Sequence, residues 1–346
     1  MSTTSDSKNT PVDPTSAPAT PNTPPADTAA SISTQPPETV ATPTTPSESE
    51  QQASPTALPS SDQLGLGRTS GQRGAEILAG LRAELIPSPT TKALARFSGQ
   101  LVARLMIQVM GRGNVPGMNY IAVRTSSLAA LIKEFIADQK DVLLVEIAAG
   151  FSPRGLELAL ALPQAQVIEI DLPDVVQEKR KRLEKGRDVT IPPNLSWREA
   201  DMGVVSLKEV LEGKVANVIT AEGLMPYFPH EQQVRIAQQV YENLTPRGLF
   251  LADMTWHEGV QKAEEGTRFF SRQAGKVLGT VKTKEEAATI FTEAGYQNVD
   301  VHLPSELAER YNLLTPVLDF QLLVAAQKKV AGAEPAVPPP ATPKAN

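Results

Sequence analysis

The chain has 346 residues and a formal net charge of −6 at pH 7. Residues 1–60 hold 12 Pro and 23 Ser or Thr but no aromatic residue, and their one Lys against six Asp or Glu accounts for −5 of that charge. The remainder is close to neutral, which argues against a nucleic-acid binder, because phosphates require a basic surface. The chain has no Cys, which excludes disulfides and a thiol nucleophile. Because it also has only three His, we expect no metal site.

The composition divides the chain into three parts. Segments as poor in apolar residues as the two ends do not bury enough surface to offset the entropy of ordering them. We therefore expect disordered tails at 1–70 and 331–346 and one domain at 71–330, with a helical cap at 71–140 and an α/β core at 141–330. No apolar run resembles a signal peptide or a membrane span, so the cytoplasm is the expected location.

The cap is predicted to be all helical. Apolar residues recur at helical spacing over 75–85, 91–109 and 126–138. The first of these helices is expected to end before Pro87 and the second near Gly111. No strand pattern appears before residue 141.

In the core, short apolar runs alternate with amphipathic segments. The runs predict strands at 142–148, 166–171, 195–201, 215–221 and 248–254, and the segments predict helices at 154–162, 173–185, 206–212 and 230–244. Five such alternations favour a Rossmann-like, mostly parallel sheet with helices on both faces. A polar insertion at 255–281 and a helix at 283–295 follow, and strands at 297–303 and 320–326 are expected to form an antiparallel pair at the sheet edge.

The turn after the first strand consists of small residues. Ala148, Ala149 and Gly150 let the backbone approach a ligand closely at the carboxyl edge of the sheet, although an ordinary tight turn would contain the same residues. The turn lacks the G-x-G-x-x-G pattern, which disfavours a dinucleotide.

Acidic residues follow the next three strands. Asp171 suits the hydroxyls of a ribose, Asp201 beside Met202 suits an adenine ring, and Glu222 suits a cationic group. Simpler interpretations are a helix cap for Asp171 and a plain loop residue for Asp201. Together the three carboxylates predict a site for an adenosine-containing, cationic ligand without phosphate, a description that S-adenosyl-L-methionine fits.

Three strings of the sequence resemble the leucine carboxyl methyltransferase-like family. They are VEIAAGFSPRG, IEIDLPDVVQEKRKRL and EGLMPYFP, and the resemblance extends over roughly 90–330. This family includes protein-phosphatase carboxyl methyltransferases and bacterial O-methyltransferases linked to polyketide biosynthesis. The resemblance implies a class I methyltransferase fold with S-adenosyl-L-methionine as the cofactor.

The resemblance also implies roles for individual residues. It places Gly150 at the methionine part of the cofactor, and Arg124 of the Arg124-Thr125 pair at its carboxylate, although Arg124 as a plain surface residue is the alternative. A further basic residue of the cap corresponds to Lys92 or Arg96. The complete cofactor-binding set is Arg124, Glu146, Ala149, Gly150, Asp171, Leu172, Asp201, Met202 and Glu222.

Candidate catalytic residues lie farther along the chain. His257 is the candidate base, although an exposed loop histidine is the favoured interpretation. Tyr227 is the second candidate and would line an apolar acceptor pocket with Trp256, Phe269 and Phe270. An acceptor that is already ionised, such as a carboxylate, would need no base.

The sequence thus predicts an S-adenosylmethionine-dependent O-methyltransferase that acts on a carboxyl or hydroxyl group of a small molecule, a polyketide-like metabolite being one candidate. Neither a nucleic acid nor a membrane is an expected partner. Two alternatives stay open. One is a non-catalytic cofactor-binding or scaffold protein of the same fold, whose Pro-rich tail binds an unknown partner. The other is a protein C-terminal carboxyl methyltransferase.

Overall fold

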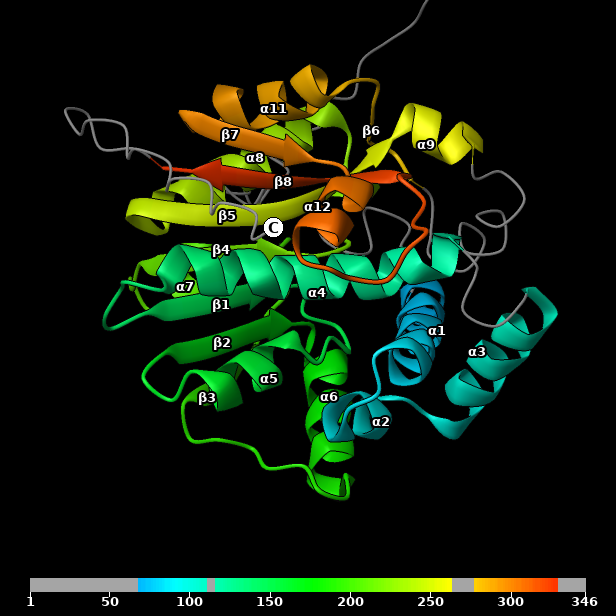
Figure 1. Cartoon of the computed structure of the whole chain (residues 1–346). Coiled ribbons are helices and arrows are strands. Elements are labelled where there is room, and N and C mark those ends of the chain that lie inside the picture. Colours follow the sequence, from blue (N-terminus) through cyan, green and yellow to red (C-terminus); the bar gives the residue numbers. More distant parts are fainter. Residues whose placement is uncertain (1–67, 111–115, 263–276, 329–346) are drawn as a thin grey trace, which may run out of the picture. The chain divides into compact units, whose positions relative to one another are not determined.

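The computed structural model of the chain describes residues 68–110, 116–262 and 277–328 (Figure 1). The predicted tails lie outside these residues, except for the first turn of the first helix. Four helices form the cap: α1 (Arg68–Leu85), α2 (Pro89–Leu94), α3 (Phe97–Met110) and α4 (Pro116–Ile136). An all-helical segment before the first strand is therefore confirmed.

The prediction of one helix over 91–109 is wrong, because two helices cover this region. Ser88 caps α2 by accepting a hydrogen bond from the Thr91 N–H, and Ala95 in an extended conformation ends it. The break lets α3 turn back along α1, where Gly80 and Gly99 meet so closely that a Cβ on Gly80 would lie 2.3 Å from the Gly99 carbonyl oxygen. Tertiary packing therefore overrides the local helical pattern at this point.

The sheet has the predicted class. Its strands are β1 (Leu143–Ile147), β2 (Gln166–Asp171), β3 (Leu195–Glu199), β4 (Ala216–Ala221), β5 (Leu244–Trp256), β6 (Thr280–Val281), β7 (Asn298–His302) and β8 (Gln321–Gln327). The order is β3-β2-β1-β4-β5-β8-β7, with β6 paired to β5. Strand β8 is antiparallel to both of its neighbours and the other pairs are parallel. The antiparallel pair at the edge is thus confirmed.

The remaining helices follow the predicted alternation. They are α5 (Arg154–Ala161), α6 (Pro173–Lys185), α7 (Leu207–Val210), the 3-10 helix η1 (Met225–Tyr227), α8 (His230–Glu242), α9 (His257–Lys262), α11 (Lys284–Glu293) and α12 (Pro304–Arg310). The insertion expected at 255–281 is shorter than predicted. Strand β5 continues to Trp256 because Met254 and Thr255 still pair with β8, and α9 and β6 occupy further parts of the segment.

Two helical layers enclose the sheet. On one face, α7, α8 and α11 contribute Leu207, Ile236 and Ile290 to a hydrophobic core. On the other face, α1, α2, α4, α5, α6 and α12 build a second core. Figure 1 shows α4, α5 and α12 in front of the strands and α8 and α11 behind them. Because the cap helices lie over the second face, charged groups of α1 and α4 can reach the carboxyl ends of the strands.

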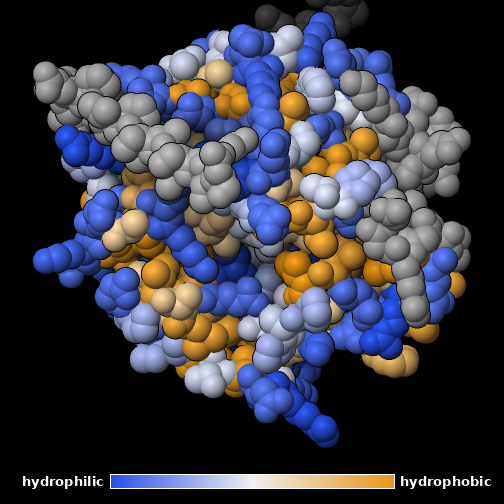
Figure 2. All heavy atoms as spheres, in the orientation of Figure 1, coloured by the Kyte–Doolittle hydropathy of each residue, from blue (hydrophilic) through white to orange (hydrophobic). Residues whose placement is uncertain are grey.

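A smaller hydrophobic cluster joins the cap to the body. It contains Leu81, Ala103, Met118 and Tyr120, and Phe320 packs against it from the segment before β8. Figure 2 shows hydrophobic residues gathered around the right-hand half of α4, where these segments meet. Among the helices of the described ranges, none has the length and apolar character needed to cross a membrane.

Candidate active site

The turn after β1 and the end of β2 are joined through one carboxylate. Asp171 accepts hydrogen bonds from the N–H groups of Gly150 (2.6 Å) and Leu172 (2.7 Å). Gly150 has a φ of 48°, a conformation that favours glycine. Burial raises the pKa of Asp171, and the two N–H donors oppose this effect. Gly150, Asp171 and Leu172 therefore lie together, as predicted.

The predicted adenine pair lies in the loop after β3. Asp201 accepts a hydrogen bond from the Gly203 N–H (2.8 Å) and thereby shapes its own turn. Met202 is half-buried and packs against the first hydrophobic core. Because β3 pairs with β2, this loop follows the strand next to the one that ends at Asp171. The plain loop interpretation of Asp201 accounts for its one described side-chain hydrogen bond.

Three guanidinium groups converge on the predicted carboxylate after β4. Glu222 pairs with Arg82 of α1, with Arg124 of α4 (2.9 Å) and with Arg154 of α5. All four side chains are almost fully buried. The interpretation of Arg124 as a surface residue is therefore wrong, and both oxygens of Glu222 carry arginine partners.

The electrostatics of this group, called the arginine cluster below, follow from its burial. Burial by itself would raise the pKa of Glu222, but the attraction of Arg82, Arg124 and Arg154 outweighs it and holds the pKa well below its usual value. For Arg82, burial and repulsion by the other two guanidiniums lower the pKa despite Glu222. Arg82 is thus the cation that the surrounding charges stabilise least.

Two further buried acids complete the arginine cluster. Glu146 of β1 accepts a hydrogen bond from Arg154 (2.5 Å), and Asp253 of β5 accepts one from Arg124 (2.8 Å). The six charges, three arginines and three carboxylates, sum to zero. Glu146 is 2% exposed and lies within β1, where it holds Arg154, and its role in binding the cofactor stays a prediction.

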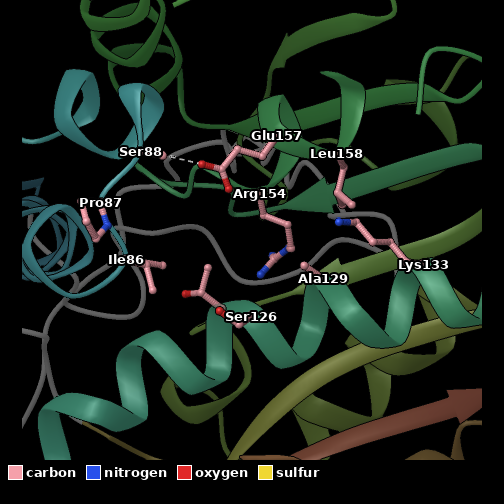
Figure 3. Close-up of a pocket in the computed structure, with 10 residues that line it drawn as sticks. Ile86, Pro87, Ser88, Ser126, Ala129, Lys133, Arg154, Glu157 and Leu158 are labelled. Carbon is pink, nitrogen blue, oxygen red and sulfur yellow. Dashed lines mark hydrogen bonds between the residues drawn. The ribbon is translucent and has the colours of Figure 1, made fainter. Parts of the chain in front are cut away.

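A cavity of about 310 Å³ lies beside the arginine cluster. It is formed between α4, α5 and the segment that joins α1 to α2, and Arg154 lines it (Figure 3). Thr125 belongs to its lining as well. In Figure 3, the Ser88 hydroxyl donates a hydrogen bond to Glu157 at one side of the cavity. The exposed Lys133 lines the cavity from α4. The same Thr125 accepts a hydrogen bond from Arg82 (3.1 Å), so the cavity borders the cluster directly.

The two catalytic candidates are placed differently. Tyr227 is half-buried, and its pKa is raised by burial and by the charge of Asp253, one of the acids of the arginine cluster. His257 begins α9, is exposed and lies 3.0 Å from Gln261 of the same helix. Trp256 donates a hydrogen bond to the Lys282 carbonyl (2.9 Å). Phe269 and Phe270 lie outside the described residues.

Neither Lys92 nor Arg96 has a described contact with the arginine cluster. Arg96 is exposed and pairs with Glu178 (2.7 Å), and Lys92 is exposed as well. Arg82 reaches the cluster instead. Its signal in the sequence is a cation on an apolar helix face, between Leu78 and Leu85.

Two more residues of the cluster escaped sequence reasoning. Arg154 lies in the quoted AAGFSPRG string, but its partners Glu146 and Glu222 come from two different strands. Asp253 interrupts the apolar run GLFLADM. A carboxylate in a buried strand requires a partner. An Asp within this apolar run is therefore a sequence signal for a buried cation nearby.

Comparison with known proteins finds one family model that matches part of the chain. A sequence model described as leucine carboxyl methyltransferase matches residues 77–241. Over these residues, the chain is similar to the leucine carboxyl methyltransferase family. The predicted resemblance is confirmed over this range, and S-adenosyl-L-methionine is the cofactor that it supports. No curated protein matches the sequence.

Solved structures with similar folds include methyltransferases. One is an O-methyltransferase family protein from Burkholderia thailandensis, with 15% identity, a TM-score of 0.44 and coverage of 62% of this chain and 59% of that chain. Human N-acetylserotonin methyltransferase has 12% identity, a TM-score of 0.44 and coverage of 70% of each chain. Magnesium protoporphyrin IX methyltransferase from Synechocystis has 12% identity, a TM-score of 0.46 and coverage of 67% of this chain and 95% of that chain. This chain therefore spans less than two thirds of the Burkholderia protein.

Proposed function

We propose that the protein transfers a methyl group from S-adenosyl-L-methionine to an oxygen atom of a small-molecule acceptor. The observation that carries this proposal is the arrangement at the carboxyl edge of β1, β2 and β4. There the Asp171–Gly150 pair lies at the ends of β2 and β1, and Glu222 with its three arginines lies at the end of β4. The pair suits a ribose, and the arginine cluster suits an amino acid, which carries both charges.

The residues fit this cofactor in space and in charge. A Cβ added to Gly150 or Gly223 would meet no atom within 4 Å, so both turns face open space. The arginine cluster is neutral, and the amino-acid end of the cofactor adds one positive and one negative charge. Its carboxylate can accept hydrogen bonds from Arg124, and its ammonium can donate hydrogen bonds to Glu222. Every buried charge would then keep a partner of opposite sign.

The contribution of the chain to catalysis is positional. When bound, S-adenosyl-L-methionine supplies a methyl group on a positively charged sulfur, which an acceptor oxygen displaces. Asp171 would hold the ribose, and Arg124 with Glu222 would hold the amino-acid end. Fixing both ends of the donor holds its methyl group in place for attack by a bound acceptor. Such positioning of two reactants is the main way in which the protein can lower the barrier to methyl transfer.

The described residues near the arginine cluster favour an acceptor that is already ionised. Burial and Asp253 raise the pKa of Tyr227, so its hydroxyl stays protonated at neutral pH and is poorly suited to act as a base. His257 is exposed and paired within its own helix. A carboxylate needs no base, whereas a phenol or alcohol benefits from one. We therefore infer that the acceptor is a carboxylate and the product a methyl ester.

The test uses the full chain with methyl-labelled S-adenosyl-L-methionine and matched pairs of acceptors, each a carboxylic acid and the corresponding alcohol or phenol. We expect label on the acids, released by mild base as esters are. Transfer to phenols alone would refute the carboxylate acceptor, and transfer to the carboxyl ends of peptides alone would favour a protein carboxyl methyltransferase. Cofactor binding without transfer to any class would favour the non-catalytic alternative.

A further inference from the structure

Asp253 is a fully buried carboxylate to which neither the sequence motifs nor the proposed chemistry assigns a part in holding the cofactor. It lies in β5, its exposed fraction is 0%, and each of its oxygens has a partner. Oδ1 accepts a hydrogen bond from the Gly223 N–H (2.6 Å), and Oδ2 accepts one from Nη1 of Arg124 (2.8 Å). Burying a carboxylate is expensive unless it is paired in this way.

The two partners of Asp253 belong to different parts of the proposed methionyl site. Gly223 directly follows Glu222 and has a φ of 71°, so a hydrogen bond to its N–H fixes the turn that carries Glu222. Arg124 comes from α4 and also pairs with Glu222 (2.9 Å) and donates to Gln321 (3.1 Å). One carboxylate thus holds a strand end and a cap helix in a fixed relation.

The hydrogen bonds of Arg124 leave its Nε–H without a described partner, and Nη2 carries a second N–H besides the one that faces Glu222. Nη1 serves Asp253 and Gln321, and Nη2 serves Glu222. Nε is buried and has no hydrogen-bond partner among the described residues. Nε–H and Nη2–H together form the fork that binds a carboxylate through two parallel hydrogen bonds. With Nη1 anchored on Asp253, this fork is the part of the guanidinium that remains for a ligand.

We propose that Asp253 is a positioning residue for the amino-acid end of the cofactor, which it serves by anchoring Nη1 of Arg124 and the N–H of Gly223. This inference rests on the proposed function. Without the Asp253 carboxylate, the guanidinium of Arg124 would shift toward Glu222, its remaining acidic partner. The turn at Gly223 would lose the hydrogen bond that fixes it. Asp253 touches neither cofactor nor acceptor, so its effect is confined to the part of the ligand that Arg124 and Glu222 contact.

The experiment compares two ligands that differ only at that end. S-adenosylhomocysteine carries the amino acid, and 5′-deoxy-5′-methylthioadenosine keeps the nucleoside and the sulfur but lacks it. Calorimetry with Asp253→Asn should show at least tenfold weaker binding of S-adenosylhomocysteine and a change of less than twofold for methylthioadenosine. In turnover assays, KM for the cofactor should rise more than kcat falls.

The matched control is Glu169→Gln, which removes another buried carboxylate from the same sheet. Glu169 pairs with Lys179 (2.9 Å) and Trp197 (2.7 Å), away from Arg124, so this variant should bind both ligands as the unmodified chain does. If Asp253→Asn does not fold, Asp253→Glu keeps the charge and displaces the carboxylate by one methylene, and it should show the same selective loss.

Two results would overturn the inference: equal weakening of both ligands, or unchanged binding of S-adenosylhomocysteine, in the Asp253 variant. A failure of the unmodified chain to bind S-adenosylhomocysteine would instead refute the proposed function. The two failures are therefore distinguishable.

Discussion

Replacing Glu222 by Gln tests the arginine cluster most severely. The change removes the carboxylate that three guanidiniums share and leaves Glu146 and Asp253 as the acids of the cluster. The buried charges then sum to +1. Breaking a buried ion pair by removing one partner costs about 3–5 kcal/mol, and for a domain of this size that corresponds to a fall in Tm of roughly 6–20 °C.

The dependence on pH has a definite sign. The folded-state pKa of Glu222 lies below its ordinary value of 4.5 because burial is outweighed by the three arginines. Its stabilising contribution is therefore fully present above that ordinary value and is lost as the pH falls below it. The difference in stability between the unmodified chain and Glu222→Gln should be largest at neutral pH and should shrink in acid.

Urea unfolding at several pH values measures this difference. The control is Glu231→Gln, which removes an exposed carboxylate paired with Arg235 (2.6 Å) one helical turn away and should change stability by at most about 0.5 kcal/mol. Because Glu222→Gln leaves an unpaired buried cation, sulfate should stabilise this variant more than the unmodified chain. A loss below about 1 kcal/mol, within the range that exposed ion pairs give, would contradict the buried cluster.

Three further changes test other parts of the account. Asp171→Ala should weaken S-adenosylhomocysteine binding at least tenfold in calorimetry; an unchanged affinity would remove the ribose role. Gly80→Ala places a Cβ 2.3 Å from the Gly99 carbonyl oxygen and should destabilise the fold by about 1–3 kcal/mol in thermal unfolding. The control Gly117→Ala, whose Cβ would have its nearest neighbour at 3.9 Å, should not destabilise the fold in this way. Equal effects of the two variants would refute the close contact of α1 and α3. His257→Ala should keep kcat within about threefold, because its ring is exposed, and a loss of a hundredfold or more would identify it as a base.

The sheet could be predicted from sequence because its signals are local. Strands such as Gln166–Asp171 read as short apolar runs, and Pro173 marks the start of the following helix. The ends of parallel strands meet at one edge, so Asp171, Gly150 and Glu222 could be placed near one another without coordinates.

The arginine cluster could not be assembled in this way, because its contacts join distant residues. Arg82 lies 140 positions from Glu222, and Arg124 lies 129 positions from Asp253. Nothing in the pattern of either helix specifies which strand end its arginine reaches. The break between α2 and α3 escaped prediction for the same reason, since it depends on the contact between Gly80 and Gly99.

The central claim is that a nucleoside with an amino-acid end binds across the carboxyl edge of the sheet, between Asp171 and the arginine cluster. Titration calorimetry of the full chain with S-adenosylhomocysteine measures it directly. The account predicts saturable binding of one ligand per chain. The absence of binding at millimolar ligand would contradict it.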